Sequence, residues 1–401
     1  MIGLYQPLNP GTAGVFFVPG LEQNEGVVLD GQGAETMAHA GHTTVDRLLP
    51  GELRDLSVRV QRNCDIADAR HAGNDTLCVY LLKMREFYRW MRRLPYSAAL
   101  DREEVGDWVI RQERLWEDLE ERDLEPLPLG RTHYDPFDHE SINRWLDPHG
   151  LVYGAGYGRG ARPLFFLGRL VSREDFEGYR IYVVGEEAAR DLVAPPAMSR
   201  GDLIFVRTES IRRMLHEMIE AWQFRGAPAD DALSRALNAY GHASGDDRSF
   251  QAMVDSEVES AVWHEVGEVL AGRLLGPAWQ ALVLEVAGTR GERVMRAVRD
   301  HLADSLTTLP ALLQGGSDGA LHFYFANLGG MRGTLAPHLR KAYEAWLETG
   351  SLDALKRLVA PSREHWLAVA RRLLNEGPES WPISDAELPS LCPDAVSCPQ
   401  S

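Results

Sequence analysis

The sequence predicts a mainly α-helical protein of the α+β class, with helical bundle-like domains and a small antiparallel β insertion. Apolar residues recur with helical spacing through most of the chain from about residue 50 onward. Between Gly150 and about Arg207 the period changes towards two, and Gly and Pro separate short apolar runs. The chain has 401 residues, which is enough for two or three domains and a sizeable core.

Composition divides the chain into five segments. Residues 1–45 are rich in Gly, Pro and Asn without a sustained period, so we expect a loosely ordered segment. A helical region is expected over residues 46–125 and a β-rich insertion over residues 126–208. A second helical domain is expected over residues 209–380, followed by a flexible, Pro-containing tail over residues 381–401.

The region 46–125 is expected to contain three helices. They should run over residues 52–71, over residues 76–93, and onward from the N-cap residue Asp101. The predicted apolar stripe of the second helix consists of Leu77, Leu81, Met84, Tyr88 and Met91.

In the first helix, Cys64, Asp68 and His71 share one side, with a spacing that can bind a metal. A structural role is the favoured interpretation. Cys64 is then a small core residue, while Asp68, Arg70 and His71 form a local polar network.

The β insertion is expected to form strands joined by Gly- and Pro-containing turns. Gly154, Gly156, Gly158 and Gly160 have a spacing that resembles a phosphate-binding loop. Neither a Gly-Lys-Ser/Thr sequence nor a helical pattern follows, so a hairpin is the favoured interpretation.

Helices are expected to resume near Glu209. In the helix that begins there, His216 and Glu220 point away from the apolar stripe and should form an exposed i, i+4 pair. Further helices are expected over residues 230–240, 291–306, 335–347, 352–359 and 362–374.

The longest helix, from Asp247 to Gly276, carries the main candidate site. At about 100° per residue, Glu257, His264 and Glu268 fall within about 40° of one another on one face. The other faces are apolar, which predicts a buried helix. Buried carboxylates beside a histidine must be paired, neutralised or bound to a metal.

A bound metal ion is one way to compensate the charge of these buried carboxylates. His264 and Glu268 can bind one ion from the same face, and Glu257 can add a carboxylate. His301 and His322 are further candidate ligands from other segments. Carboxylates and histidines among packed helices are typical ligands of non-haem iron or manganese, and less often of zinc, so the set indicates a metal-dependent enzyme.

The string Trp-His-Glu-Val-Gly-Glu also resembles the zinc-protease helix His-Glu-x-x-His. In that interpretation His264 is a ligand and Glu265 is the catalytic base that acts on a bound water. The second histidine of the motif is replaced by Glu268, and a match of a few residues recurs by chance, so peptidase activity is not favoured.

The alternative is a non-enzymatic scaffold or binding protein. The charged groups of the central helix would then be satisfied by arginines such as Arg273, Arg296 or Arg332 in a buried ion network. Geometry separates the two interpretations. A metal site needs several side-chain donors around one point, whereas a network places a guanidinium between the carboxylates.

The net charge of -17 argues against nucleic-acid and anionic-membrane partners, since both require a basic surface. No apolar run reaches the ~18 residues that a membrane span needs. Four cysteines are too few for a disulfide framework, so a reducing cytoplasm is the expected location.

Two stretches carry a resemblance to a known family. They are Arg-Asn-Cys-Asp-Ile-Ala-Asp-Ala-Arg-His-Ala at 62–72, continuing into Leu-Cys-Val-Tyr-Leu-Leu-Lys-Met-Arg-Glu-Phe-Tyr-Arg-Trp at 77–90, and Val-Arg-Asp-His-Leu-Ala-Asp-Ser-Leu at 298–306. Together they resemble an uncharacterised bacterial family known only as a domain of unknown function. The resemblance covers the chain from about residue 50 onward and implies no reaction, ligand set or cofactor.

Overall fold

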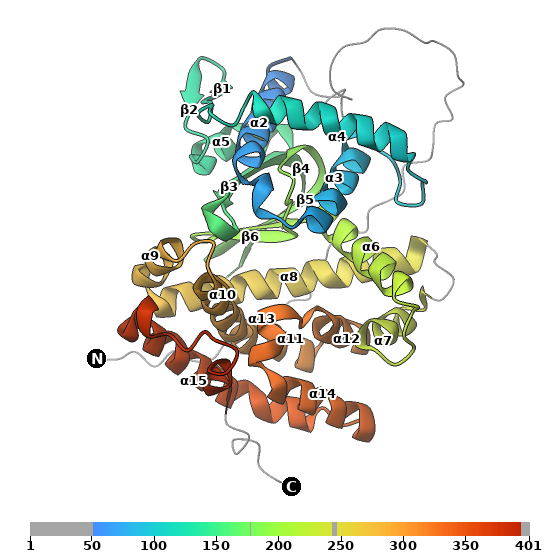
Figure 1. Ribbon diagram of the computed structural model, residues 1–401, viewed down its shortest axis with the longest axis vertical. Coiled ribbons are helices and arrows are strands. Elements are labelled where there is room, and N and C mark those ends of the chain that lie inside the picture. The colour runs from blue at the N-terminus through green and yellow to red at the C-terminus, as the bar shows by residue number, and fades with distance from the viewer. Residues whose placement is uncertain (1–50, 177, 243–246, 394–401) are drawn as a thin grey trace.

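The computed structural model describes residues 51–176, 178–242 and 247–393. The prediction for residues 1–45 therefore lies outside the described residues. Within them the expected fold class is confirmed. Helices dominate, and they accompany one five-stranded sheet and a two-stranded hairpin (Figure 1).

The first part of the chain forms three helices over one side of the sheet. They are α2 (Gly51–His71), α3 (Leu77–Met91) and α4 (Arg102–Glu117). Asp101 caps α4 as predicted, because its carboxylate accepts the N–H groups of Glu103 and Glu104. The hairpin β1 (Leu127–Leu129) and β2 (Thr132–Tyr134) and the short helix α5 (His139–Leu146) follow.

The predicted stripe of α3 is wrong in its first half. Leu77 and Leu81 are 70% and 48% exposed, whereas Met84, Phe87 and Tyr88 are buried. The buried face packs with Trp108 of α4. In the N-terminal half of α3 it is Tyr80, not Leu77 or Leu81, that turns to α4, where its hydroxyl donates to Glu113 at 3.0 Å. Apolar spacing alone did not identify the side that is buried.

The sheet has the strand order β3-β4-β5-β7-β6. Its strands are β3 (Leu151–Tyr157), β4 (Pro163–Phe176), β5 (Tyr179–Arg190), β6 (Ala197–Arg200) and β7 (Leu203–Arg207). The glycine-rich stretch forms the β3–β4 hairpin, as predicted. The sheet is mixed rather than wholly antiparallel, because the chain passes to the edge strand β6 before it returns as β7, parallel to β5. Register shifts between β4 and β5 bend the sheet.

A fully buried ion pair lies inside the sheet region. Arg207 donates from Nε to Glu187 Oε1 at 2.6 Å and from Nη2 to Oε2 at 2.8 Å, and both side chains are 0% exposed. The guanidinium also lies 4.6 Å from the ring centre of Phe166. Such a paired fork is the arrangement in which a buried arginine is tolerated.

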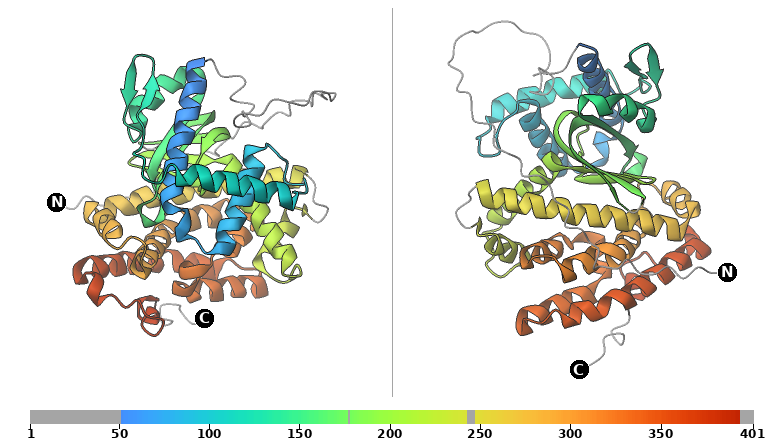
Figure 2. Two further views of the ribbon diagram at one scale, coloured as in Figure 1. Left: turned by 45° about the horizontal axis from the view of Figure 1, so that its top comes forward. Right: turned by 180° about the vertical axis from the view of Figure 1, so that it is seen from behind.

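Helix α8 (Asp247–Leu275) lies across the molecule between the sheet and the remaining C-terminal helices (Figures 1 and 2). One face packs Val258, Val262 and Val266 against sheet residues such as Ile181 and Val206. The prediction of a helix buried nearly all round is only partly correct, because 11 of the 29 residues of α8 are buried while others, such as Asp255, Glu259 and Leu274, are exposed.

In Figure 1 the other C-terminal helices lie beside the two ends of α8 and below it. They are α6 (Thr208–Phe224), α7 (Ala232–Ala239), α9 (Pro277–Glu285), α10 (Arg290–Ala303), α11 (Leu309–Gln314), α12 (Asp318–Asn327), α13 (Gly330–Leu335), α14 (Pro337–Thr349) and α15 (Asp353–Glu376). Two helices were predicted where α15 is continuous through Pro361. Buried residues on both sides of this proline, including Leu358 and Trp366, hold the helix together across it.

Two predicted side-chain pairings are wrong. Glu220 pairs with Arg85 of α3 rather than with His216, whose ring lies 4.5 Å from that of Tyr96. Asp68 pairs with Arg162 rather than with Arg70. Both partners come from distant parts of the sequence, and helical spacing cannot reveal such partners.

Candidate metal centre

The candidate site lies where α8 meets α10. Gly267 brings the two helices together, since a Cβ at this position would lie 2.5 Å from the carbonyl oxygen of Ala303 and 2.4 Å from Thr307 Oγ1. A π-helical segment, Asp304–Thr308, directly follows α10 at the contact. Such segments occur often at functional sites.

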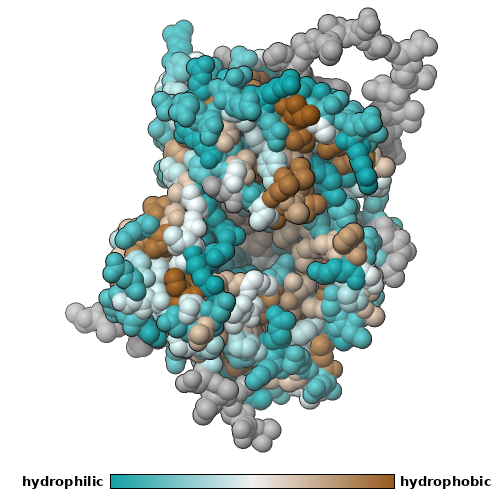
Figure 3. All heavy atoms as spheres, in the orientation of Figure 1, coloured by the Kyte–Doolittle hydropathy of each residue, from teal (hydrophilic) through white to brown (hydrophobic). Residues whose placement is uncertain are grey.

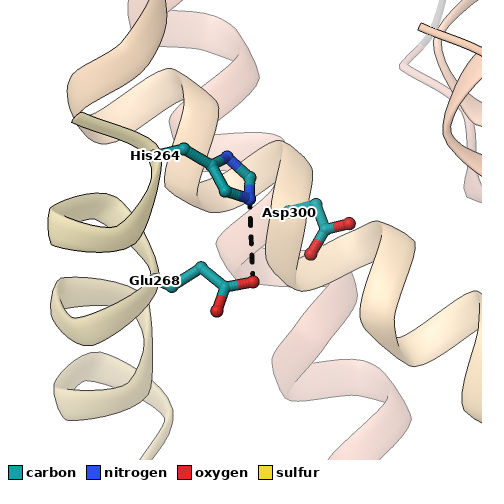
Figure 4. A group of neighbouring side chains, drawn as sticks. All are labelled: His264, Glu268 and Asp300. Atoms are coloured by element: carbon teal, nitrogen blue, oxygen red, sulfur yellow. Dashed lines mark ion pairs between the residues drawn. The ribbon is translucent and has the colours of Figure 1, made fainter. Parts of the chain in front are cut away.

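Three donors face one another across this contact. His264 and Glu268 come from α8 and Asp300 comes from α10, as Figure 4 shows. One ligand atom from each lies within 4.8 Å of the others, and His264 Nε2 is 3.7 Å from Glu268 Oε1. One imidazole with two carboxylates fits a divalent transition metal or zinc.

The ring of His264 is oriented from behind by a buried carboxylate. Its Nδ1 donates to Asp304 Oδ1 at 2.9 Å, which leaves Nε2 to face Glu268 and Asp300. Asp304 is itself held by the Tyr324 hydroxyl at 2.9 Å and by the Arg332 guanidinium. A carboxylate behind a histidine is the usual support of a metal ligand.

The site also balances its charges without an ion. Burial would lower the pKa of His264, but the hydrogen bond and charge of Asp304, with Glu268, raise it to about 9. Although burial opposes it, Arg299 and then His264 hold the pKa of Glu268 below its usual value. Burial and Glu268 raise the pKa of Asp300 to about 6. Near neutral pH the imidazolium and Arg299 therefore compensate the two carboxylates.

Glu265 projects beside this group rather than into it. The residue is 6% exposed and lines the cleft described below, and its Oε2 has no hydrogen-bond partner among the described residues. Burial and then Glu268 raise the pKa of its carboxyl to about 8. A carboxyl with a pKa near neutrality, next to a site, is suited to accept or donate a proton.

The other predicted ligands lie outside the group of three. His301 Nε2 donates to the carbonyl of Arg332 at 2.9 Å, its ring stacks on Trp366, and burial followed by Arg332 lowers its pKa to about 3. His322 is 2.9 Å from the Tyr343 hydroxyl. Glu257 is buried, and burial raises the pKa of its carboxyl to about 8.

Sequence reasoning missed Asp300 and Asp304 as parts of the site. Both lie within the stretch 298–306, separated by about one helical turn, on the side of α10 away from the buried residues Val294, Val298 and Leu302. That spacing was the available signal. Helical spacing on α8 alone could not show which face of α10 would meet it.

Comparison with models of protein families identifies the family of the chain. Residues 55–207 match the model for the N-terminal domain of a family of unknown function (DUF6866), and residues 212–393 match the model for its C-terminal domain. The chain belongs to the DUF6866 family. The predicted resemblance is thereby confirmed from near residue 50 onward. The comparisons of this DUF6866 chain with curated proteins and with solved structures found no match.

The first DUF6866 model ends with β7 and the second begins at residue 212, within the first turns of α6. The three candidate ligands, His264, Glu268 and Asp300, therefore all belong to the C-terminal family domain. Among the helices that the structure describes, none combines the length and the apolar composition needed to cross a lipid bilayer.

Proposed function

We propose that this DUF6866 protein is a metal-dependent enzyme that holds a divalent ion through His264, Glu268 and Asp300. The observation that carries the proposal is the orientation of His264, whose Nδ1 binds buried Asp304 while Nε2 faces two carboxylates. The donor set suits iron, manganese or zinc. A bound ion would act as a Lewis acid or activate a water molecule.

In this proposal Glu265 is the proton-transfer group. It lies on α8 next to His264 and lines the cleft from which a substrate would approach. It is not one of the three grouped donors. Glu265→Gln should therefore leave the metal content unchanged, which distinguishes its role from that of a ligand.

Metal content tests the proposal directly. Untagged wild-type protein, incubated with Fe²⁺, Mn²⁺ or Zn²⁺ and then dialysed, should retain close to one equivalent of one of these ions by mass spectrometry. His264→Ala and Asp300→Asn should each lose it, because removing one of three ligands weakens such a site strongly. His133→Ala changes an exposed histidine on β2 and should retain the ion.

The second candidate function, a scaffold or binding protein, has its own support. Arg299 already binds Glu268 and Arg332 binds Asp304, so the polar groups satisfy one another without an ion. If wild-type protein retains no ion while His264→Ala loses stability, the enzyme proposal is wrong and the network interpretation replaces it.

Ion binding should strengthen as pH rises. The pKa of His264 is raised to about 9, so below that pH an ion must displace its proton. Asp300, with its pKa raised to about 6, adds a second proton to displace only in more acidic solution. Between pH 6.5 and 8 the dissociation constant should fall roughly tenfold per pH unit. Calorimetric titrations in buffers of different ionisation enthalpy should show release of about one proton per ion. A pH-independent dissociation constant would exclude His264 as a ligand.

A further inference from the structure

A deep cleft lies between the part of the molecule that carries the sheet and the helical part. Its volume is about 1280 Å³, and it is lined by the β3–β4 turn and β6 on one side and by α9 and α10 on the other. Figure 3, in the orientation of Figure 1, shows the surface hollowed between these two parts. The volume is sufficient for a nucleotide-sized ligand.

The cleft is positively charged although the chain is acidic. Seven arginine and lysine side chains and four carboxylates line it, whereas the whole chain carries a net charge of -17. Local excess of one charge in a concave site attracts ligands of the opposite sign. The cleft is therefore suited to an anion.

Most of the charges in the cleft are already paired. Lys83 binds Asp75 at 2.8 Å, and Arg299 binds Glu268. Arg296 Nε donates to Glu292 at 2.7 Å. These pairs belong to the walls of the cleft and leave few charges for a ligand.

Three arginines remain without such a partner. Among the described residues, no ion pair joins Arg159, Arg200 or Arg293 to a carboxylate, and all three line the cleft. The guanidinium of Arg200 lies 5.7 Å from the ring centre of Phe137, which leaves its charge uncompensated. The three arginines come from three separate elements: the β3–β4 turn, the end of β6 and the first turn of α10. Chain segments distant in sequence thus bring three unpaired positive charges to one cavity.

We propose that this cleft binds a phosphorylated small molecule, with Arg159, Arg200 and Arg293 as its anion-binding residues. A guanidinium presents a planar fork of donors that matches phosphate oxygens. A phosphate group offers three acceptor oxygens and up to two negative charges, so it can engage more than one fork at once. The proposal concerns anion binding alone and does not depend on whether the neighbouring centre holds a metal.

The test uses the full chain, freed of metal with a chelator that is then dialysed away. Pyrophosphate and adenosine triphosphate are titrated by calorimetry at low ionic strength, with citrate as the carboxylate comparator. Pyrophosphate or adenosine triphosphate should bind more tightly than citrate, and binding should weaken with added salt. The triple variant R159Q/R200Q/R293Q should bind at least about tenfold more weakly.

A matched variant controls for the loss of net charge. R357Q/R363Q/R371Q removes three exposed arginines from α15, none of which lines the cleft. It should bind within about twofold of wild type. The single variant Arg293→Gln, at an exposed position, should weaken binding even if the triple variant fails to fold. The proposal would be overturned if neither phosphate probe bound, if citrate bound more tightly than both, or if the two triple variants lost affinity equally.

Discussion

Replacing Arg207 by methionine should lower the free energy of unfolding by about 3–5 kcal/mol. The substitution takes the hydrogen-bonded guanidinium away from the fully buried carboxylate of Glu187, and it also removes the cation 3.9 Å from the buried carboxylate of Asp191. A loss of this size is a large share of the ~5–15 kcal/mol that stabilises a typical domain. Chemical denaturation followed by circular dichroism measures it.

An exposed ion pair on the same sheet provides the control. Arg180 binds Asp175 at 3.0 Å, with side chains 49% and 67% exposed. Arg180→Met should therefore change the unfolding free energy by less than about 1 kcal/mol. The double variant Glu187→Leu/Arg207→Met should recover part of the loss, because it also removes the carboxylate that Arg207 binds through two hydrogen bonds. Buried Asp191, which lies 3.9 Å from the guanidinium, keeps the recovery partial. Equal effects of Arg180→Met and Arg207→Met would show that the buried ion pair contributes no more to the free energy of unfolding than the exposed one.

Replacing Gly267 by alanine should destabilise the protein by about 1–3 kcal/mol. The added Cβ would lie 2.5 Å from the carbonyl oxygen of Ala303, and backbone atoms of α10 cannot move aside as a flexible side chain can. Separation of α8 from α10 would also disturb the contact between His264 and Asp304. We therefore expect Gly267→Ala to weaken ion binding as well as stability.

Gly272, one and a half turns further along α8, is the matched control. A Cβ there would meet no atom within 4 Å. Within a helix, alanine is favoured over glycine by about 0.5–1 kcal/mol, so Gly272→Ala should stabilise the protein by that amount. The two substitutions on one helix should thus have opposite signs in urea unfolding. A stabilising effect of Gly267→Ala would contradict the close approach of α8 and α10.

The predictions from sequence succeeded where a local pattern determines the structure. The cap at Asp101 and the glycine-rich hairpin both depend on residues close together in the chain. The parallel pairing of β5 with β7 depends on a path across the sheet, and the sequence contains no local signal for it.

The candidate site likewise contains residues that local spacing predicted and residues that it did not. His264 and Glu268 were selected because helical spacing places them on one face, and they lie together in the structure. Asp300 and Asp304 complete the group from α10, and only the packing at Gly267 brings that helix close. His301 was chosen from the same segment, but its ring turns to Trp366 and the carbonyl of Arg332.

Glu292 joins the two halves of the chain that the family models match separately. It belongs to α10, yet its carboxylate accepts the N–H of Gly160, from the β3–β4 turn, as well as that of Gly288. A hybrid that combined the first half of this chain with the second half of a relative would keep this link only if the relative carried a carboxylate at the same place. The two halves are therefore expected to change together during evolution rather than to be exchanged independently.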